Sequence, residues 1–246
     1  SLAYNTLYKL CYMKEQMPSQ LELTETILLM PNLIEYLFSG VKHSEYSIAS
    51  TTQLFDMKEK KWAAGILKEL GLKESMFTNV DYAGRDLGTL RPDVAAEVEQ
   101  KDLHILSVAG HDTACAVAAV PAREEEFTFL SSGTWSLMGI SSKKLLTGED
   151  IVKARISNEG TSDGGYRPTV NINGLWMVQE LRRNFERRGR SYSFAEMCEL
   201  AALERPLQSF LRPEDFMQPG DYPTEIREYC KRTGQPAKYR RVEDSI

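Results

Sequence analysis

The chain has 246 residues, 42% of them hydrophobic and 26% charged, which is typical of a globular protein with a sizeable core. Its formal net charge of −5 argues against a nucleic-acid partner, because phosphate binding needs a concentrated basic face. The four cysteines lie far apart, and neither a bilayer-spanning apolar run nor a signal peptide is present, so we expect a cytoplasmic protein without a membrane partner.

The first half of the chain carries mostly helical spacing. Pro31 near the start of one apolar segment and Gly40 at its end are typical helix boundaries. In a later segment, Trp62 and Leu67 fall on the apolar face of an amphipathic helix. The helices predicted from this spacing cover residues 2–14, 29–40 and 60–72.

Two other segments of this half have a different character. Residues 43–56, HSEYSIASTTQLFD, are rich in hydroxyl groups and predict a loop or a short strand. Residues 104–110, HILSVAG, predict a short buried strand, and the small residues at 113–120 predict a helix directly after it. This passage from strand to helix places His111 and Asp112 at the end of the strand.

The second half combines two β-runs with longer helices. The β-runs, at 127–130 and 135–140, are joined by a Ser-Ser-Gly-Thr turn. Ser193 is a good helix N-cap, and Glu196 stands at the spacing of a capping box. The helices predicted in this half cover residues 173–189, 193–203 and 221–235.

The alternation of helices and β-runs predicts an α/β fold. The charged break PAREEE, residues 121–126, separates an apolar helix from a new β-hairpin and is the predicted domain boundary. It divides the chain into domains of residues 1–122 and 123–246.

Asp112 stands where the predicted strand ends and the next helix starts. One interpretation is structural, since backbone N–H groups and the helix dipole favour a carboxylate as an N-cap. The other is functional, because α/β proteins place reactive groups at the carboxyl ends of strands. A carboxylate there could accept the proton of a hydroxyl substrate, as phosphoryl transfer requires. The residues alone leave both interpretations open.

Residues 131–134 offer hydroxyl and backbone N–H donors in one tight turn. Its glycine lets the backbone approach a ligand, so the turn could bind phosphate oxygens, although an ordinary β-turn also accounts for these residues. The chain contains no P-loop, no G-x-G-x-x-G at a helix start and no G-x-S-x-G nucleophile turn. Its three histidines lack metal-ligand spacing.

The segments GHDTACAVAAVPA, residues 110–122, and FLSSGTWSLMG, residues 129–139, resemble segments of the FGGY carbohydrate kinases. That resemblance implies two ribonuclease-H-like (actin-like) domains, and transfer of the γ-phosphoryl group of ATP, with Mg²⁺, to a sugar hydroxyl. Within the family, this sequence is most similar to members that phosphorylate L-rhamnulose at the 1-hydroxyl in rhamnose catabolism. L-fuculose and other ketoses are the alternative substrates.

The resemblance implies that Asp112 is the catalytic base. It assigns residues 1–122 to the end of a sugar-binding domain I and residues 123–246 to the start of an ATP-binding domain II. The residues that it places against the sugar are His111, Asp112, Thr113 and Asn171, and those that it places against ATP are Thr134 and Gln179. It assigns no metal ligand.

Two features of the family are missing from this sequence. One is an N-terminal phosphate-binding segment with an acidic residue that helps to hold Mg²⁺, and the other is a Gly-rich adenosine motif late in the second domain. We therefore expect an internal fragment that is inactive by itself, because phosphoryl transfer depends on positioning and electrostatics. The missing motifs also leave open a non-catalytic binding module on an actin-like fold.

Overall fold

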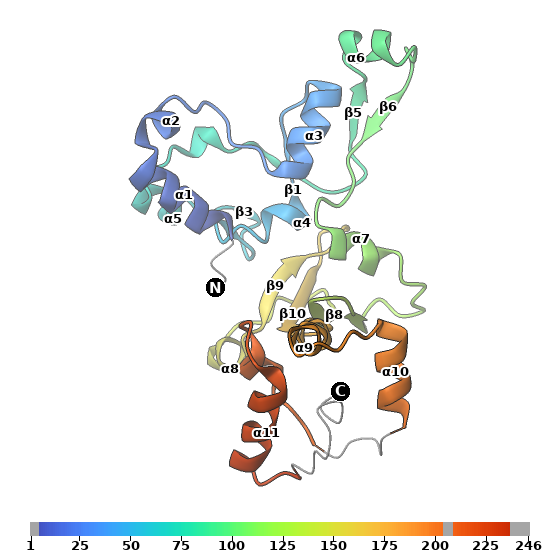
Figure 1. The fold of residues 1–246 in the computed structure, drawn as a ribbon. Helices are drawn as coiled ribbons and strands as arrows, with labels where there is room; N and C mark the ends of the chain where they lie inside the picture. Colours follow the sequence, from blue (N-terminus) through green and yellow to red (C-terminus); the bar gives the residue numbers. More distant parts are fainter. Residues whose placement is uncertain (1–4, 204–208, 237–246) are drawn as a thin grey trace. The chain divides into compact units, whose positions relative to one another are not determined.

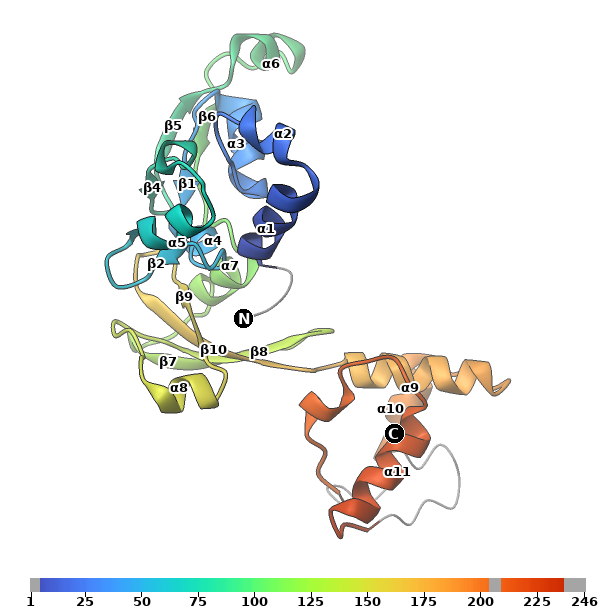
Figure 2. The same ribbon diagram turned by 90° about the vertical axis from the view of Figure 1, so that its left-hand side faces the viewer.

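A computed structural model describes residues 5–203 and 209–236 of the chain. Contacts between residues group the chain into two compact units, and Figures 1 and 2 show the elements of both. Unit 1 comprises residues 1–129 and 139–170, and unit 2 comprises residues 130–138 and 171–246. This grouping does not follow the predicted boundary at residues 121–126, which stays a prediction.

Unit 1 combines short helices with small sheets around an aromatic core. Tyr46, Phe55, Trp62 and Phe77 are buried together there, and neighbouring rings pack edge-on or tilted at 4.9–5.8 Å between centroids. The helices of this unit are α1 (Thr6–Gln16), α2 (Pro18–Glu22), α3 (Met30–Ser39), α4 (Tyr46–Ala49), α5 (Ala64–Glu69), α6 (Pro92–Glu97), α7 (Asp112–Ala118) and α8 (Glu149–Lys153), with a 3₁₀ turn at Glu74–Met76.

Three pairs of strands lie among these helices. The first pair is parallel and the other two are antiparallel, and α6 lies at the far end of the third pair in Figure 1. The pairs are β1 (Ser44–Glu45) with β4 (Val80–Asp81), β2 (Phe55–Asp56) with β3 (Lys61–Trp62), and β5 (Asp86–Thr89) with β6 (His104–Leu106).

A four-stranded sheet has the strand order β7-β8-β10-β9. Strands β9 and β10 are antiparallel, and their register places Glu159 directly opposite Arg167. The boundary between the two units falls within β7, β8 and β10. The strands are β7 (Phe127–Ser131), β8 (Ser136–Ser141), β9 (Ser157–Gly160) and β10 (Tyr166–Ile172).

Unit 2 is mainly helical in its described part. Leu181 and Phe185 on the first helix pack with Met197, Tyr222 and residues around them into a second core. These helices are α9 (Trp176–Arg187), α10 (Phe194–Ala202) and α11 (Tyr222–Arg232), with a 3₁₀ turn at Pro213–Phe216.

Several local predictions are confirmed. Helix α3 has proline in its first turn and ends at Gly40, whose φ of 75° is the left-handed conformation that glycine adopts readily. Helix α10 starts with the full capping box of Ser193 and Glu196. The helix expected over residues 2–14 is α1, and residues 2–4 lie outside the described part of the chain.

Two predictions from sequence patterns are wrong. Trp62 belongs to strand β3 and not to the helix that follows it, because its ring is needed in the aromatic core beside Phe55. Residues 43–56 are not simply a polar loop with a short strand. They contain α4 between β1 and β2, and most of their side chains are buried, including the polar groups of Glu45 and Ser47. Hydrogen bonds between these groups replace those that they would make with water.

The strand expected to be buried before Asp112 is also different. Strand β6 covers only His104–Leu106, and the side chains of Leu106 and Val108 are 58% and 61% exposed. In the described residues β6 pairs with β5 alone, and although α3 contacts this pair, it does not cover Leu106 and Val108. The apolar run thus predicted the strand correctly but not its burial.

Lys60 holds parts of unit 1 together through its ammonium group. Nζ donates to the Gly164 carbonyl at 2.6 Å and lies 5.3–5.8 Å from the ring centroids of Tyr46, Tyr82 and Tyr166. We expect Lys60→Met to lower the free energy of unfolding by about 1–2 kcal/mol, because it removes the hydrogen bond and the cation–π contacts. Urea titration would measure this effect. Equal stability of Lys60→Met and of the exposed-site control Lys58→Met would contradict it.

Across residues 5–203 and 209–236, no helix has both the length and the apolar character needed to cross a membrane.

Candidate active site

Asp112 is the first residue of α7, and His111 is the N-cap residue. The N-cap interpretation of Asp112 is therefore wrong by one position. Its side chain is 97% exposed, and Oδ1 accepts a hydrogen bond from the Thr113 backbone N–H at 2.6 Å. An exposed carboxylate at a helix start keeps acceptor capacity for a ligand hydroxyl.

Glu45 holds the backbone of Gly110 and His111, the two residues before Asp112, through hydrogen bonds, the second by way of Ser47. Its side chain is fully buried, and one oxygen, Oε2, accepts from the Ser47 hydroxyl at 2.6 Å, the Ile48 N–H at 3.1 Å and the Gly110 N–H at 2.8 Å. Ser47 Oγ in turn accepts from the His111 N–H at 3.2 Å. Two consecutive amides before the carboxylate are thus held by one buried acid and its hydroxyl partner.

The backbone at residue 110 lies so close to Glu45 and Ile48 that only glycine fits there. A Cβ atom at this position would lie 2.8 Å from Ile48 Cγ2 and 3.3 Å from Glu45 Oε2. Real Cβ atoms essentially never come within 3.0 Å of another heavy atom, so the Ile48 contact alone would make a side chain at Gly110 push the segment away from α4. The glycine of the GHDT motif therefore permits the hydrogen bond between Gly110 and Glu45.

His111 lies between Asp112 and a buried ion pair. Its side chain is 21% exposed, and Nδ1 accepts from Arg167 Nη2 at 3.1 Å and lies 3.7 Å from Asp112 Oδ1. Arg167 is fully buried on β10 and also forms an ion pair with Glu159 of β9. Burial lowers the pKa of His111, Glu159 raises it and Arg167 lowers it, with a net lowering. His111 is therefore mostly neutral near pH 7.

Thr113 is buried, and its hydroxyl lies 3.2 Å from Asp112 Oδ1. The structure therefore brings three of the predicted sugar-site residues, His111, Asp112 and Thr113, into one continuous segment. The fourth, Asn171, lies half-buried on β10 and belongs to unit 2. Its role stays a prediction.

The two residues predicted to contact ATP meet in unit 2. Gln179 Nε2 donates to Thr134 Oγ1 at 3.0 Å, which joins the turn between β7 and β8 to α9. The carbonyls of Gly133 and Thr134 accept from the Leu175 and Trp176 N–H groups at 3.0 and 3.1 Å. The turn thus packs against the start of α9, and the Thr134 hydroxyl is bonded to the Gln179 amide.

Gly174 permits this contact between turn and helix, and its substitution gives a test. A Cβ atom there would lie 2.7 Å from the Gly133 carbonyl oxygen and 2.2 Å from Ser136 Oγ. We expect Gly174→Ala to separate Thr134 from Gln179 and to weaken ATP binding about tenfold or more, measured by calorimetry on the product of the complete gene. Gly65→Ala is the control, because Gly65 lies in helix α5, has no left-handed φ and leaves an added Cβ atom in open space. Unchanged ATP affinity for Gly174→Ala would contradict this account of the turn.

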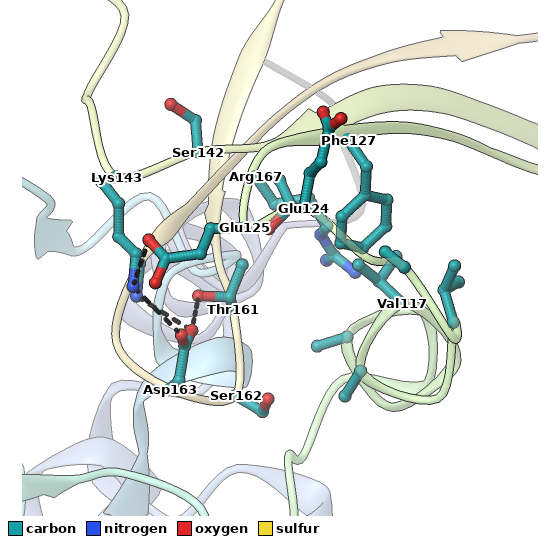
Figure 3. A pocket seen from close by; sticks show the side chains of 16 residues that line it. Val117, Glu124, Glu125, Phe127, Ser142, Lys143, Thr161, Ser162, Asp163 and Arg167 are labelled. Carbon is teal, nitrogen blue, oxygen red and sulfur yellow. Dashed lines mark hydrogen bonds and ion pairs between the residues drawn. The ribbon is translucent and has the colours of Figure 1, made fainter.

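A cavity of about 320 Å³ lies elsewhere in unit 1, beside the later residues of α7 (Figure 3). Lys143 Nζ lies 3.9 Å from Glu125 and 3.8 Å from Asp163 at its rim, and Arg167 lies behind it near Val117. His111 and Asp112 do not line this cavity. Arg167, which donates to His111, is among the residues that line it.

The described residues do not assemble a protein cage for the Mg²⁺ ion that the family resemblance implies. No group of three or more His, Cys, Asp or Glu side chains in this part of the chain is arranged to hold a metal ion. Mg²⁺ often binds through one or two carboxylates together with substrate phosphates, and those contacts are not assigned to residues of this chain.

Comparison with known proteins identifies relatives of this chain. Residues 1–119 match the N-terminal domain of the FGGY family of carbohydrate kinases. The rhamnulokinase of Bacteroides thetaiotaomicron is 35% identical over 240 residues, which are 97% of this chain and 49% of that protein. Residues 1–119 belong to the N-terminal domain of the FGGY family of carbohydrate kinases. The rhamnulokinase of Halalkalibacterium halodurans is 36% identical over 235 residues, which are 95% of this chain and 49% of that protein.

Solved structures of a xylulose kinase and a glycerol kinase share the fold. A ligand-bound xylulose kinase from Lactobacillus acidophilus gives a TM-score of 0.69 at 13% identity, over 82% of this chain and 40% of that chain. Glycerol kinase from Plasmodium falciparum with ADP gives a TM-score of 0.67 at 10% identity, over 82% of this chain and 41% of that chain. The predicted α/β, actin-like fold class is thereby confirmed. The chain spans about half the length of the curated relatives it matches.

Proposed function

We propose that the protein carrying this chain is an ATP-dependent sugar kinase that phosphorylates L-rhamnulose at its 1-hydroxyl. The observation that carries the proposal is the exposed Asp112 carboxylate at the start of α7, on a segment held by Glu45 and Ser47. The similarity to rhamnulokinases over nearly the whole chain supports the choice of sugar.

In this proposal Asp112 acts as general base. Its carboxylate accepts the proton of the sugar 1-hydroxyl as that oxygen attacks the γ-phosphorus of ATP, and the bond to the ADP oxygen breaks. The fixed helix start supports this role, because a base must stay within hydrogen-bond distance of the hydroxyl during the transfer. His111 and Thr113 flank the base and are proposed to contact the sugar, together with Asn171.

Thr134 and Gln179 are proposed to contact ATP. Both are neutral, and the hydrogen bond between them fixes the orientation of the amide and the hydroxyl. Neutral donors in fixed positions stabilise charge on a transferring phosphoryl group without first having to reorganise. Their assignment to the nucleotide follows the family resemblance, and the proposed domain boundary at residues 121–126 separates them from the base.

A panel of sugars tests the proposal. The product of the complete gene is incubated with ATP and with L-rhamnulose, L-fuculose, D-xylulose or glycerol, and ADP release is measured by a coupled assay. We expect kcat/KM to be highest for L-rhamnulose. A higher value for L-fuculose would replace the proposed substrate. Sugar binding without ADP release from any member of the panel would favour a non-catalytic binding module.

A further inference from the structure

Arg167 is an unusual feature of the site because its guanidinium is completely buried and only partly bonded. Nη2 contacts the Glu159 carboxylate and His111 Nδ1, whereas Nε and Nη1 have no hydrogen-bond partner. Burying a charged group with unpaired N–H groups is costly, so stability gives a weak reason for an arginine here. The contact between Arg167 and His111 offers a functional reason for an arginine at this position.

Arginine has five N–H donors and no acceptor. His111 Nδ1 can therefore bond to Arg167 only through its lone pair, which places the single proton of the neutral ring on Nε2. Nδ1 is also the ring nitrogen that faces Asp112, at 3.7 Å. A proton on Nδ1 would draw the Asp112 carboxylate into a pair with the imidazole.

We propose that Arg167, held by Glu159, is a positioning residue that keeps His111 in its neutral Nε2–H tautomer. This arrangement has two consequences for the proposed kinase, on which the inference rests. His111 offers an N–H donor to a sugar oxygen beside the base. Asp112 is not paired with the imidazole and retains its lone pairs for the substrate hydroxyl. Arg167 acts through His111 and does not itself contact the sugar.

The charged groups that face His111 come from four elements: Glu159 on β9, Arg167 on β10, Asp112 on α7 and Glu45 on β1. The three acids favour a charged ring, and Arg167 opposes it. Removing the Arg167 charge therefore raises the pKa of His111, and a larger fraction of the ring carries a proton on Nδ1 as the pH falls.

The tautomer can be measured in the 246-residue chain without any substrate. The chain has three histidines, so ring ¹⁵N–¹H correlation spectra are simple, and His111→Gln assigns the signals. We expect wild-type His111 at pH 7.5 to show a protonated Nε2 and an unprotonated Nδ1. A protonated Nδ1 in the wild type would overturn the proposal, whatever happens to the variants.

His104 provides an internal reference, since its Nδ1 lies 2.9 Å from Asp86 Oδ2 and should carry a proton. In Arg167→Met we expect Nδ1–H character at His111, and in Arg167→Lys, which still offers only donors, we expect the Nε2–H form to return. Arg123→Met, an exposed arginine of the same unit, should leave the His111 signals unchanged. A wild-type tautomer in a folded Arg167→Met variant would also overturn the proposal.

The second arm measures kcat/KM against pH in the product of the complete gene. For Arg167→Met we expect a loss of about tenfold at pH 6 and of about twofold at pH 8.5, since one pKa unit corresponds to a tenfold change in the protonation equilibrium. A pH-independent loss would indicate a merely structural role and would contradict the proposal. If the wild type transfers no phosphate, the proposed function fails and the NMR arm alone decides the tautomer.

Discussion

Asp112→Asn in the product of the complete gene is expected to lower kcat by about 10³-fold, with a change in the dissociation constant of the sugar of less than about threefold. The amide keeps the size of the carboxylate and can still accept the Thr113 N–H bond, so the start of α7 should be preserved. It cannot take the proton of the sugar hydroxyl, and general-base catalysis is lost. Steady-state kinetics gives kcat, and calorimetry gives sugar binding.

Asp102→Asn is the matched control, because Asp102 is an exposed acid in the turn before β6. It should leave both kcat and sugar binding unchanged. A near-normal kcat for Asp112→Asn would remove Asp112 from the role of base. Loss of sugar binding that equals the loss of kcat would assign it to binding alone.

Glu45→Ala is expected to have the largest effect on stability, lowering the free energy of unfolding by about 3 kcal/mol. It leaves the N–H groups of Ile48 and Gly110 and the Ser47 hydroxyl without their shared acceptor in a buried site. Glu45→Gln keeps an acceptor oxygen and should cost about 1–2 kcal/mol. Urea titration of the 246-residue chain measures both values.

The same Glu45→Gln substitution separates support of the site from general stability. In the product of the complete gene we expect KM for the sugar to rise about tenfold, because the Gly110–His111 segment is no longer held as firmly. Glu69→Gln, at an exposed position of α5, should change neither stability nor KM. Unchanged kinetics in a folded Glu45→Gln variant would contradict the supporting role of Glu45.

The sequence was most informative where one short segment determines both structure and chemistry. Gly110, His111 and Asp112 are consecutive, so the GHDT motif indicated the carboxylate and the helix start that presents it. Thr134 and Gln179 lie 45 residues apart, and the family resemblance assigned both to ATP before the structure showed their hydrogen bond.

Glu45 and Arg167 were not predicted as parts of the site, because their roles depend on contacts between distant segments. Glu45 meets Gly110 across 65 residues, and Arg167 meets His111 across 56. Residues 43–56 are rich in hydroxyls, a pattern that is typical of loops, and the sequence does not reveal that these hydroxyls bond to each other in a core. Glu45 caps α4 by accepting the Ile48 N–H, but glutamate is not among the preferred N-cap residues, so this role was not visible in the sequence.

At two further positions, Trp62 and strand β6, the structure differs from the sequence prediction because the outcome depends on contacts with distant segments. Trp62 fits a helical stripe, yet it lies on β3 because the aromatic core needs its ring. The apolar run at β6 indicated a strand, but burial depends on what covers a strand, and periodicity contains no information about a covering layer.

The central claim is that the γ-phosphoryl group of ATP passes to a sugar hydroxyl with Asp112 as base. The most direct measurement follows the label of [γ-³²P]ATP in the product of the complete gene with L-rhamnulose. The account predicts that the label appears in a sugar 1-phosphate with the wild type, and that its transfer is about 10³-fold slower with Asp112→Asn. Label that stays in ATP or appears only as inorganic phosphate would contradict it.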